Sequence, residues 1–163
     1  MAEENQAATE GTQRKFAIQR IYTKDVSFET PNSPDIFTQE WRPKVDVSLN
    51  TTTKSLDNNH YELVLDITVT ATQDDKTLYL AEVKQAGIFL IEGFGTQEFG
   101  QMLAIYCPNV LFPYAREAIS DLVTRGSFPQ FLLAPVNFEA AYAQQLKRQQ
   151  EAQQEKPADA PAH

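Results

Sequence analysis

Alternation of apolar and polar residues over the first half of the chain is the feature that most limits its possible folds. Successive side chains of a β-strand point to opposite faces, so a period of two predicts a half-buried strand. In the segment 16–29 the expected buried side chains are Phe16, Ile18, Tyr22, Val26 and Phe28, with Ile21 as an apolar exception. The opposite parity carries Asp25 and Glu29, which we expect on one solvent-facing surface.

Three more segments show the same alternation and predict three more strands. Their ranges are 44–49, 61–69 and 77–91, with a polar turn at 50–59 and a tight turn at 73–76. The last strand is apolar at both parities where it begins. If Ala81 and Val83 face the core, then Leu78, Leu80 and Glu82 face outward. Leucines beside a carboxylate are unusual on a solvent-facing surface.

The segment 30–43 connects the first two strands and is expected to be a loop. Its three prolines exclude a regular helix or a central strand. It nevertheless carries Ile36, Phe37 and Trp41, the only tryptophan of the chain. A loop with such side chains either packs onto the folded body or binds a partner, and the sequence leaves both open.

The period changes after Gly95. Phe99, Leu103 and Tyr106 recur at helical spacing and predict a helix that stops near residues 107–108, where a proline follows the cysteine. A second helix is expected to begin close to Pro113, because proline suits a first turn. We expect it to end at Gly126, which is a good residue to follow a helix.

The last part of the body is expected to be an extended segment followed by a helix. Residues 127–136 are strongly apolar and contain two prolines, so they should lie extended against the body. Asn137 is a suitable N-cap for an amphipathic helix whose apolar stripe is Phe138, Tyr142 and Leu146.

Strands followed by helices predict an α+β domain, with helices on one face of a four-stranded antiparallel sheet and water on the other. The expected domain covers residues 16–146. Residues 1–15 and 147–163 are poor in large apolar side chains. Such segments bury too little apolar surface to offset their ordering entropy, so both are expected to be disordered tails.

Charge and apolar patterning limit the compartment and the partners. The net charge of −8 disfavours nucleic acid, because phosphate binding needs a basic surface. The N-terminus lacks the basic and apolar regions of a signal peptide, and no apolar run approaches the ~20 residues that cross a bilayer. We expect a cytoplasmic protein without direct membrane insertion.

No arrangement of residues argues for catalysis, although an enzyme remains possible. His60 follows a polar turn and His163 ends the chain, and both are expected to be surface histidines. Cys107 is the only cysteine and has no partner base near it in sequence, which favours a buried or interfacial thiol. The short run 93–95, Gly-Phe-Gly, lacks the remainder of a phosphate-binding motif.

The surplus of large apolar side chains is better explained by binding. The loop around Trp41, the segment 127–136 and the last helix offer more of them than one small core needs. Such surfaces usually contact other polypeptides, as subunit interfaces or as a groove for extended chain. A cavity for a small ligand is the competing interpretation.

Four stretches closely resemble the SecB family of bacterial protein-export chaperones. They are IQRIYTKDVSFE at 18–29, AGIFLIEG at 86–93, YCPNVLFPYARE at 106–117 and RGSFPQFLLAPVNF at 125–138. The resemblance extends over residues 16–146. It implies a homotetramer, assembled as a dimer of dimers, that binds unfolded precursors of exported proteins, keeps them competent for translocation and delivers them to SecA. It implies no cofactor and no metal.

The resemblance also implies three groups of site residues. Acidic residues on the outer sheet face would dock the C-terminal segment of SecA, and the matching residues are Asp25, Glu29, Leu80 and Glu82. Residues of the fourth strand that affect assembly are matched by Ala81, Val83 and Gln85. The groove for client chains would be lined by Trp41, Val45, Val47, Leu49, Tyr142 and Leu146. Plain core packing remains an alternative for the last two groups.

Two other classes of function stay open at this point. A chaperone devoted to a toxin–antitoxin partner would share the fold. A small-molecule carrier or a hydrolase would need a closed pocket or a set of catalytic residues.

Overall fold

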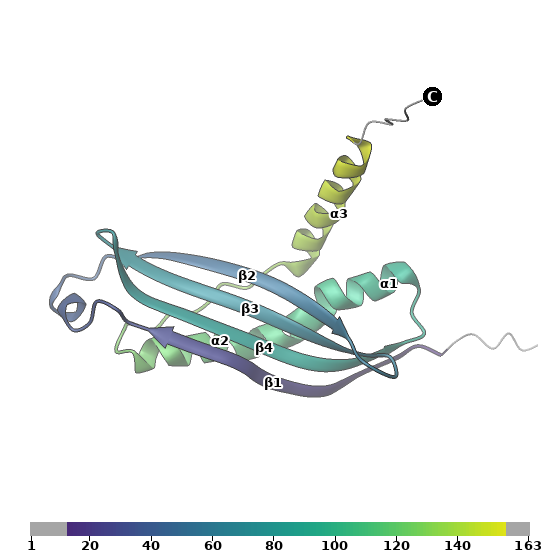
Figure 1. Cartoon of the computed structure of the whole chain (residues 1–163), viewed down its shortest axis with the longest axis horizontal. Coiled ribbons are helices and arrows are strands. Elements are labelled where there is room, and N and C mark those ends of the chain that lie inside the picture. The colour runs from purple at the N-terminus through teal and green to yellow at the C-terminus, as the bar shows by residue number, and fades with distance from the viewer. Residues whose placement is uncertain (1–12, 156–163) are drawn as a thin grey trace, which may run out of the picture.

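A computed structural model of the chain describes residues 13–155. It contains a four-stranded antiparallel sheet with the strand order β1-β4-β3-β2 (Figure 1). The strands are β1 (Lys15–Glu29), β2 (Lys44–Ser55), β3 (His60–Gln73) and β4 (Lys76–Glu92). Helices cover one face, which we call the helix face, and the opposite face is the outer face. The predicted α+β architecture is confirmed.

Two bulges in β1 correct the expected parity in the middle of this strand. The register shifts between Ile18 and Arg20 and again between Thr23 and Asp25. Each extra residue reverses the parity, so two bulges restore it. Between the bulges Ile21 faces the helices and Tyr22 faces outward, the reverse of the prediction. Asp25 lies after the second bulge and faces outward as expected.

The other strands differ from the prediction at two places. β2 continues to Ser55, so the expected polar turn at 50–59 shrinks to residues 56–59. Leu78 is not on the outer face, because a register shift beside it breaks the alternation and it is 2 % exposed in the core. The predicted turn at 73–76 is confirmed, with positive φ angles at Asp74 and Asp75.

One helical segment replaces the two expected helices. It comprises α1 (Thr96–Gln101), a π turn η2 (Met102–Tyr106) and α2 (Cys107–Arg125). Pro108 cannot donate a backbone hydrogen bond and its ring crowds the preceding turn. The wide π turn lies directly before it, and the Cys107 N–H bonds to the Met102 carbonyl oxygen. The expected stop at 107–108 is therefore wrong, and Pro113 lies inside α2.

The core lies between α2 and the helix face of β3 and β4. Its fully buried members include Leu65, Ile67, Val69, Phe89, Leu111, Ile119 and Val123. α2 ends where the sequence predicts. A Cβ at Gly126 would lie 2.4 Å from the Phe28 ring, so the close approach of helix and sheet requires glycine there.

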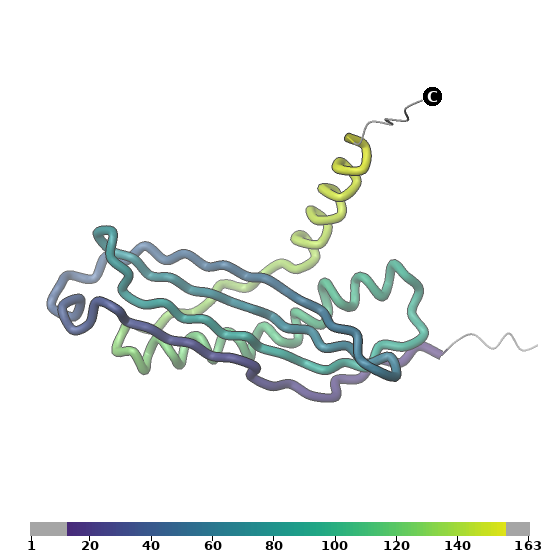
Figure 2. Tube along the Cα trace, in the orientation of Figure 1, coloured from purple at the N-terminus to yellow at the C-terminus, as the bar shows by residue number. Residues whose placement is uncertain are grey.

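After a turn at Gly126 and Ser127, the chain runs without helix or strand from residue 128 to α3 (Phe138–Gln154), which projects away from the sheet (Figures 1 and 2). The Asn137 side chain accepts a hydrogen bond from the Ala140 N–H at 3.0 Å, as expected of an N-cap. Residues 147–154 are helical, so ordered structure continues past residue 146. Most of the expected N-terminal tail and the end of the C-terminal tail lie outside the described residues.

Candidate functional site

The four residues assigned to SecA docking lie together on the outer face. β1 and β4 are neighbours, Glu29 pairs with Leu80, and Glu82 pairs with Ser27. Asp25 and Glu29 are exposed, whereas Leu80 and Glu82 are partly buried. The structure therefore forms one surface from the outward parities of two strands that are distant in sequence.

β2 and β3 enlarge this surface. Asp46 and Asp66 also point outward, and Asp66 lies in one row with Lys84 and Asp25 across the sheet. We call this surface the acidic face, comprising Asp25, Glu29, Asp46, Asp66, Leu80, Glu82 and the base Lys84. The outward parity of Asp46 and Asp66 is visible in the sequence, but their place beside β1 and β4 follows only from the strand order.

A polar cluster of Tyr22, Lys24 and Glu62 lies on the outer face beyond the acidic face. The Tyr22 hydroxyl donates a hydrogen bond to Glu62, and the Lys24 Nζ lies 2.8 Å from Glu62 Oε1. Burial and the bond to Glu62 raise the pKa of Tyr22 to about 12. The bonds from Lys24 and Tyr22 lower the pKa of Glu62. This cluster connects the second bulge of β1 to β3 across the intervening strand.

Ala81, Val83 and Gln85 lie inside the protomer. They are on the helix face of β4 beneath α2, with exposed fractions of 0, 0 and 3 %. The Gln85 side-chain nitrogen donates to the Tyr22 carbonyl oxygen at 3.1 Å and so connects β4 to β1. The burial of these three residues agrees with the alternative that they pack the core of the protomer. If they also affect assembly, they would do so by setting the position of α2.

Two apolar side chains of β1 that were expected to be buried are exposed, and α2 exposes others. Val26 points to the helix face of β1 but is 44 % exposed, because α2 lies over β3 and β4 and leaves the edge strand open. Tyr114 is similarly exposed on α2, and a cleft of about 410 Å³ separates the two elements. The other large apolar side chains left exposed on this side are Ile18 and Tyr106.

β2 presents an uncovered apolar strip at the other edge of the sheet. Val45, Val47 and Leu49 point to the helix face, as the sequence predicts. Val45 and Leu49 are partly buried against the core, whereas Val47 is 50 % exposed. Only the middle residue of the three therefore offers its side chain freely to a ligand.

Aromatic residues stand at one end of this strip. The Trp41 ring lies 5.7 Å from the Phe128 ring, and the Phe37 ring lies 5.3 Å from it. Phe128 is buried against Tyr79 of the core, so it anchors the loop to the body. Trp41 stays 39 % exposed. The loop therefore packs on the body and still presents an aromatic surface, and its binding of a partner stays a prediction.

α3 begins at the other end of the strip. Leu49 and Tyr142 line one cavity of about 150 Å³ between β2 and α3. Leu146 lies one helical turn further along α3 and is 40 % exposed. We call Trp41, Val45, Val47, Leu49, Tyr142 and Leu146 the apolar strip.

The candidate catalytic residues are not arranged for chemistry. Cys107 is fully buried, and burial raises the pKa of its thiol to about 12. The His60 Nδ1–H donates to the Asn58 carbonyl oxygen at 2.8 Å within its own turn. Among residues 13–155 no group of three or more His, Cys, Asp and Glu side chains is placed to hold a metal ion. In the same part of the chain no helix is long and apolar enough to cross a membrane.

Comparison with known proteins gives consistent results. The model of the family described as preprotein translocase subunit SecB matches residues 9–149. A protein-export protein SecB of Marinobacter nauticus is 54% identical over 153 residues, which are 93% of each chain. The SecB of Hydrogenovibrio crunogenus is also 54% identical, over 93% of this chain and 97% of its own.

A solved structure shares the fold at low identity. It is a SecB-like chaperone of Mycobacterium tuberculosis in complex with a peptide from an antitoxin. The two structures align with a TM-score of 0.61 at 15% identity, over 75% of this chain and 91% of that one.

Proposed function

This chain belongs to the SecB family of protein-export chaperones, and from this premise we propose that its apolar strip holds unfolded precursors and its acidic face delivers them to SecA. The two surfaces lie on opposite faces of one sheet. A client and a delivery partner can therefore bind at the same time.

The observation that carries the proposal is the uncovered helix face of β2. An edge strand that keeps Val47 half exposed, with Trp41 at one end and Tyr142 at the other, matches the needs of an extended apolar client. Burial of apolar surface supplies roughly 25 cal/mol per Å² before the costs of association and ordering. Such contacts depend on the hydrophobicity of the client and require little of its exact sequence.

Binding of this kind needs no hydrolysis and no catalytic group. Selectivity then depends on time: a chain that folds quickly buries its apolar segments before capture, whereas a slow folder stays exposed. Several strips on one assembly raise the effective concentration of a second client segment once the first is bound.

The acidic face suits a basic partner. Its carboxylates surround the partly exposed Leu80, which can contribute an apolar contact to the docked segment. Carboxylates arranged in this way mainly accelerate encounter and select partners. Lys84 lies between Asp25 and Asp66 and partly offsets their charge.

Self-association would cover the apolar side chains on β1 and α2. Tyr114 lines the cleft between β1 and α2, and Val26 is exposed on the same edge strand. A second protomer can cover both, and burial of such a surface favours a symmetric assembly. We expect light scattering to give about four times the protomer mass of 18.4 kDa.

Val26→Asp is expected to shift this mass to that of a smaller species, because a carboxylate would be buried unpaired between protomers. The matched variant Val47→Asp, on the opposite edge strand, should remain tetrameric. A wild-type protein that is monomeric at micromolar concentration would contradict the assembly. An unchanged mass for Val26→Asp would contradict the interface.

The function itself is tested by capture of a precursor. A labelled, signal-bearing precursor diluted from urea should remain soluble in the presence of the protein and should transfer to SecA. The control is the mature, folded form of the same client, which should not bind. Equal binding of both forms, or turnover of a small substrate without precursor capture, would refute the export role.

A further inference from the structure

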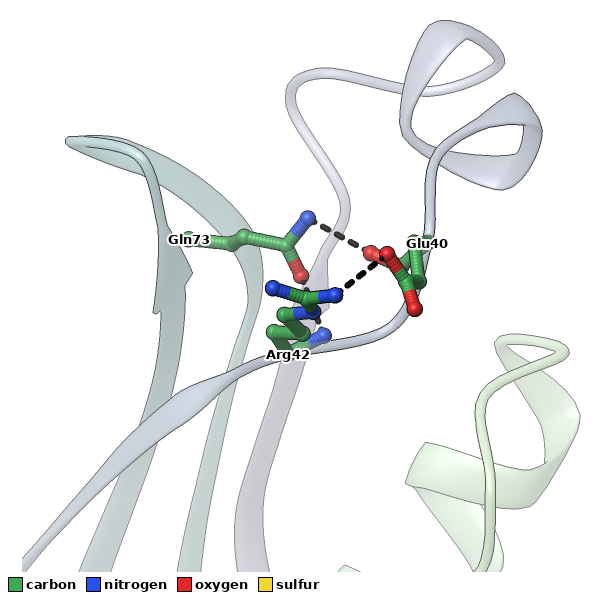
Figure 3. A network of polar contacts seen from close by, with 3 residues as sticks. All are labelled: Glu40, Arg42 and Gln73. Atoms are coloured by element: carbon green, nitrogen blue, oxygen red, sulfur yellow. Dashed lines mark hydrogen bonds and ion pairs between the residues drawn. The ribbon is translucent and has the colours of Figure 1, made fainter.

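The side-chain carboxamide of Gln73 makes two hydrogen bonds to the backbone of the loop that carries Trp41 (Figure 3). Its oxygen accepts from the Arg42 N–H at 2.7 Å, and its nitrogen donates to the Glu40 carbonyl oxygen at 2.8 Å. The two bonded residues directly precede and follow Trp41 in the chain. We call this pair of hydrogen bonds the bracket.

The sequence explains why a side chain is used at this place. The backbone pairing of β2 with β3 ends at Lys44 and Thr72. The next residue of the loop is Pro43, which has no N–H and cannot continue the ladder. Gln73 follows Thr72, and its carboxamide has the same donor and acceptor groups as a peptide unit. It therefore continues the pairing beyond the proline.

The other contacts near Trp41 are weaker constraints on the backbone. The Arg42 Nη2 lies 2.8 Å from Glu40 Oε2, but both side chains are 76% exposed. Ion pairs with such exposure contribute little. The contact between the Trp41 and Phe128 rings holds one side of the indole but leaves the backbone at residues 40–42 free to shift. The bracket removes this freedom.

We propose that Gln73 is a positioning residue for the client surface: its carboxamide holds Trp41 in place at its end of the apolar strip. The proposal rests on the client role of that strip and specifies one of its determinants. A binding group that is already in place does not have to be ordered by the ligand, which increases affinity without adding a contact. If the competent arrangement is populated only in part, the affinity falls by that fraction.

Trp41 reports its own position, because it is the only tryptophan in the chain. Gln73→Leu replaces the carboxamide with a shorter, apolar side chain and removes both hydrogen bonds. We expect its tryptophan emission, measured without client, to show lower anisotropy and stronger quenching by acrylamide. Capture of the unfolded precursor should weaken on the order of threefold to tenfold, and the thermal midpoint should change little.

Arg42→Ala is the matched control, because it removes the exposed ion pair and keeps the backbone N–H that Gln73 binds. Its tryptophan emission and its capture of the precursor should equal those of the wild type. Trp41→Ala removes the indole and therefore measures the largest loss of precursor capture that a misplaced indole could cause.

Three outcomes decide the proposal. Increased quenching and weaker capture for Gln73→Leu, with neither for Arg42→Ala, support it. Unchanged quenching for Gln73→Leu overturns it and leaves the export role intact. Capture of the precursor by Trp41→Ala at the wild-type level also overturns the proposal, because Trp41 would then make no contact with the client.

Discussion

Val47→Asp is expected to weaken capture of an unfolded precursor by roughly tenfold or more, which corresponds to at least about 1.4 kcal/mol. Val47 is 50 % exposed in the protomer, so a client that lies along β2 would bury it. The replacement removes apolar contact area and leaves a carboxylate without a partner in an apolar contact. Titration of the protein against a labelled precursor measures the loss.

Ser48→Asp provides the matched control for Val47→Asp. Ser48 is the next residue of β2, is also exposed, and points to the outer face. Both variants introduce aspartate into the same strand, so they share its low strand preference and its charge. Only Val47→Asp should lose the precursor. Equal losses in the two variants would assign the effect to the strand and not to the apolar strip.

Val47 is a sharper test than its two neighbours of the same parity. Val45 and Leu49 pack against the core as well as facing the helix side. Their truncation would combine a loss of stability with any loss of client contact. A variant at Val47 separates the two effects.

Replacing both Asp25 and Glu82 with alanine is expected to weaken binding of the C-terminal segment of SecA by at least about tenfold. Both carboxylates belong to the acidic face, and a basic partner would lose two of its counter-charges. Asp25 is exposed and Glu82 is partly buried on the solvent-facing side of the sheet, so we expect the thermal midpoint and client capture to change little. Calorimetry with the isolated segment measures the affinity.

The double variant Glu139→Ala, Glu151→Ala controls for net charge. Both residues are exposed on α3, away from the acidic face, and their removal changes the total charge by the same amount. Wild-type binding should decline as salt rises, because the Debye length shortens to about 10 Å at 0.1 M. Loss of binding in both double variants would indicate a general charge effect, and retained affinity in Asp25→Ala, Glu82→Ala would exclude docking there.

Much of the proposed binding surface could be predicted because a β-strand has a strict period of two. That period predicts that Asp25, Glu29, Leu80 and Glu82 point to the outer face. The predicted face of β1 was correct at both ends because its two bulges cancel, and wrong at Ile21 and Tyr22 between them. The expected burial of Ile18 and Val26 was wrong, because no helix covers this edge strand. A bulge depends on the pairing partner, so the sequence of a single strand does not reveal it.

Prolines and polar strands produced the other errors. Pro108 predicted a helix end, yet a π turn accommodates it and the helix continues over the sheet. The polar run 50–55 resembled a turn, but β3 supplies a paired edge on which it forms a strand. In both cases neighbouring elements stabilise a conformation that the local residues do not favour on their own.

The sequence by itself determined the order of the elements, the α+β class, the N-cap at Asn137 and the two faces of the sheet. These features follow from local chemistry and from side-chain periodicity. The tertiary structure alone decided that β1 adjoins β4, that α2 buries Ala81 and Val83, and that Gln73 bonds to the loop around Trp41. Each of these depends on contacts between residues far apart in the chain, which the pattern of neighbouring residues does not encode.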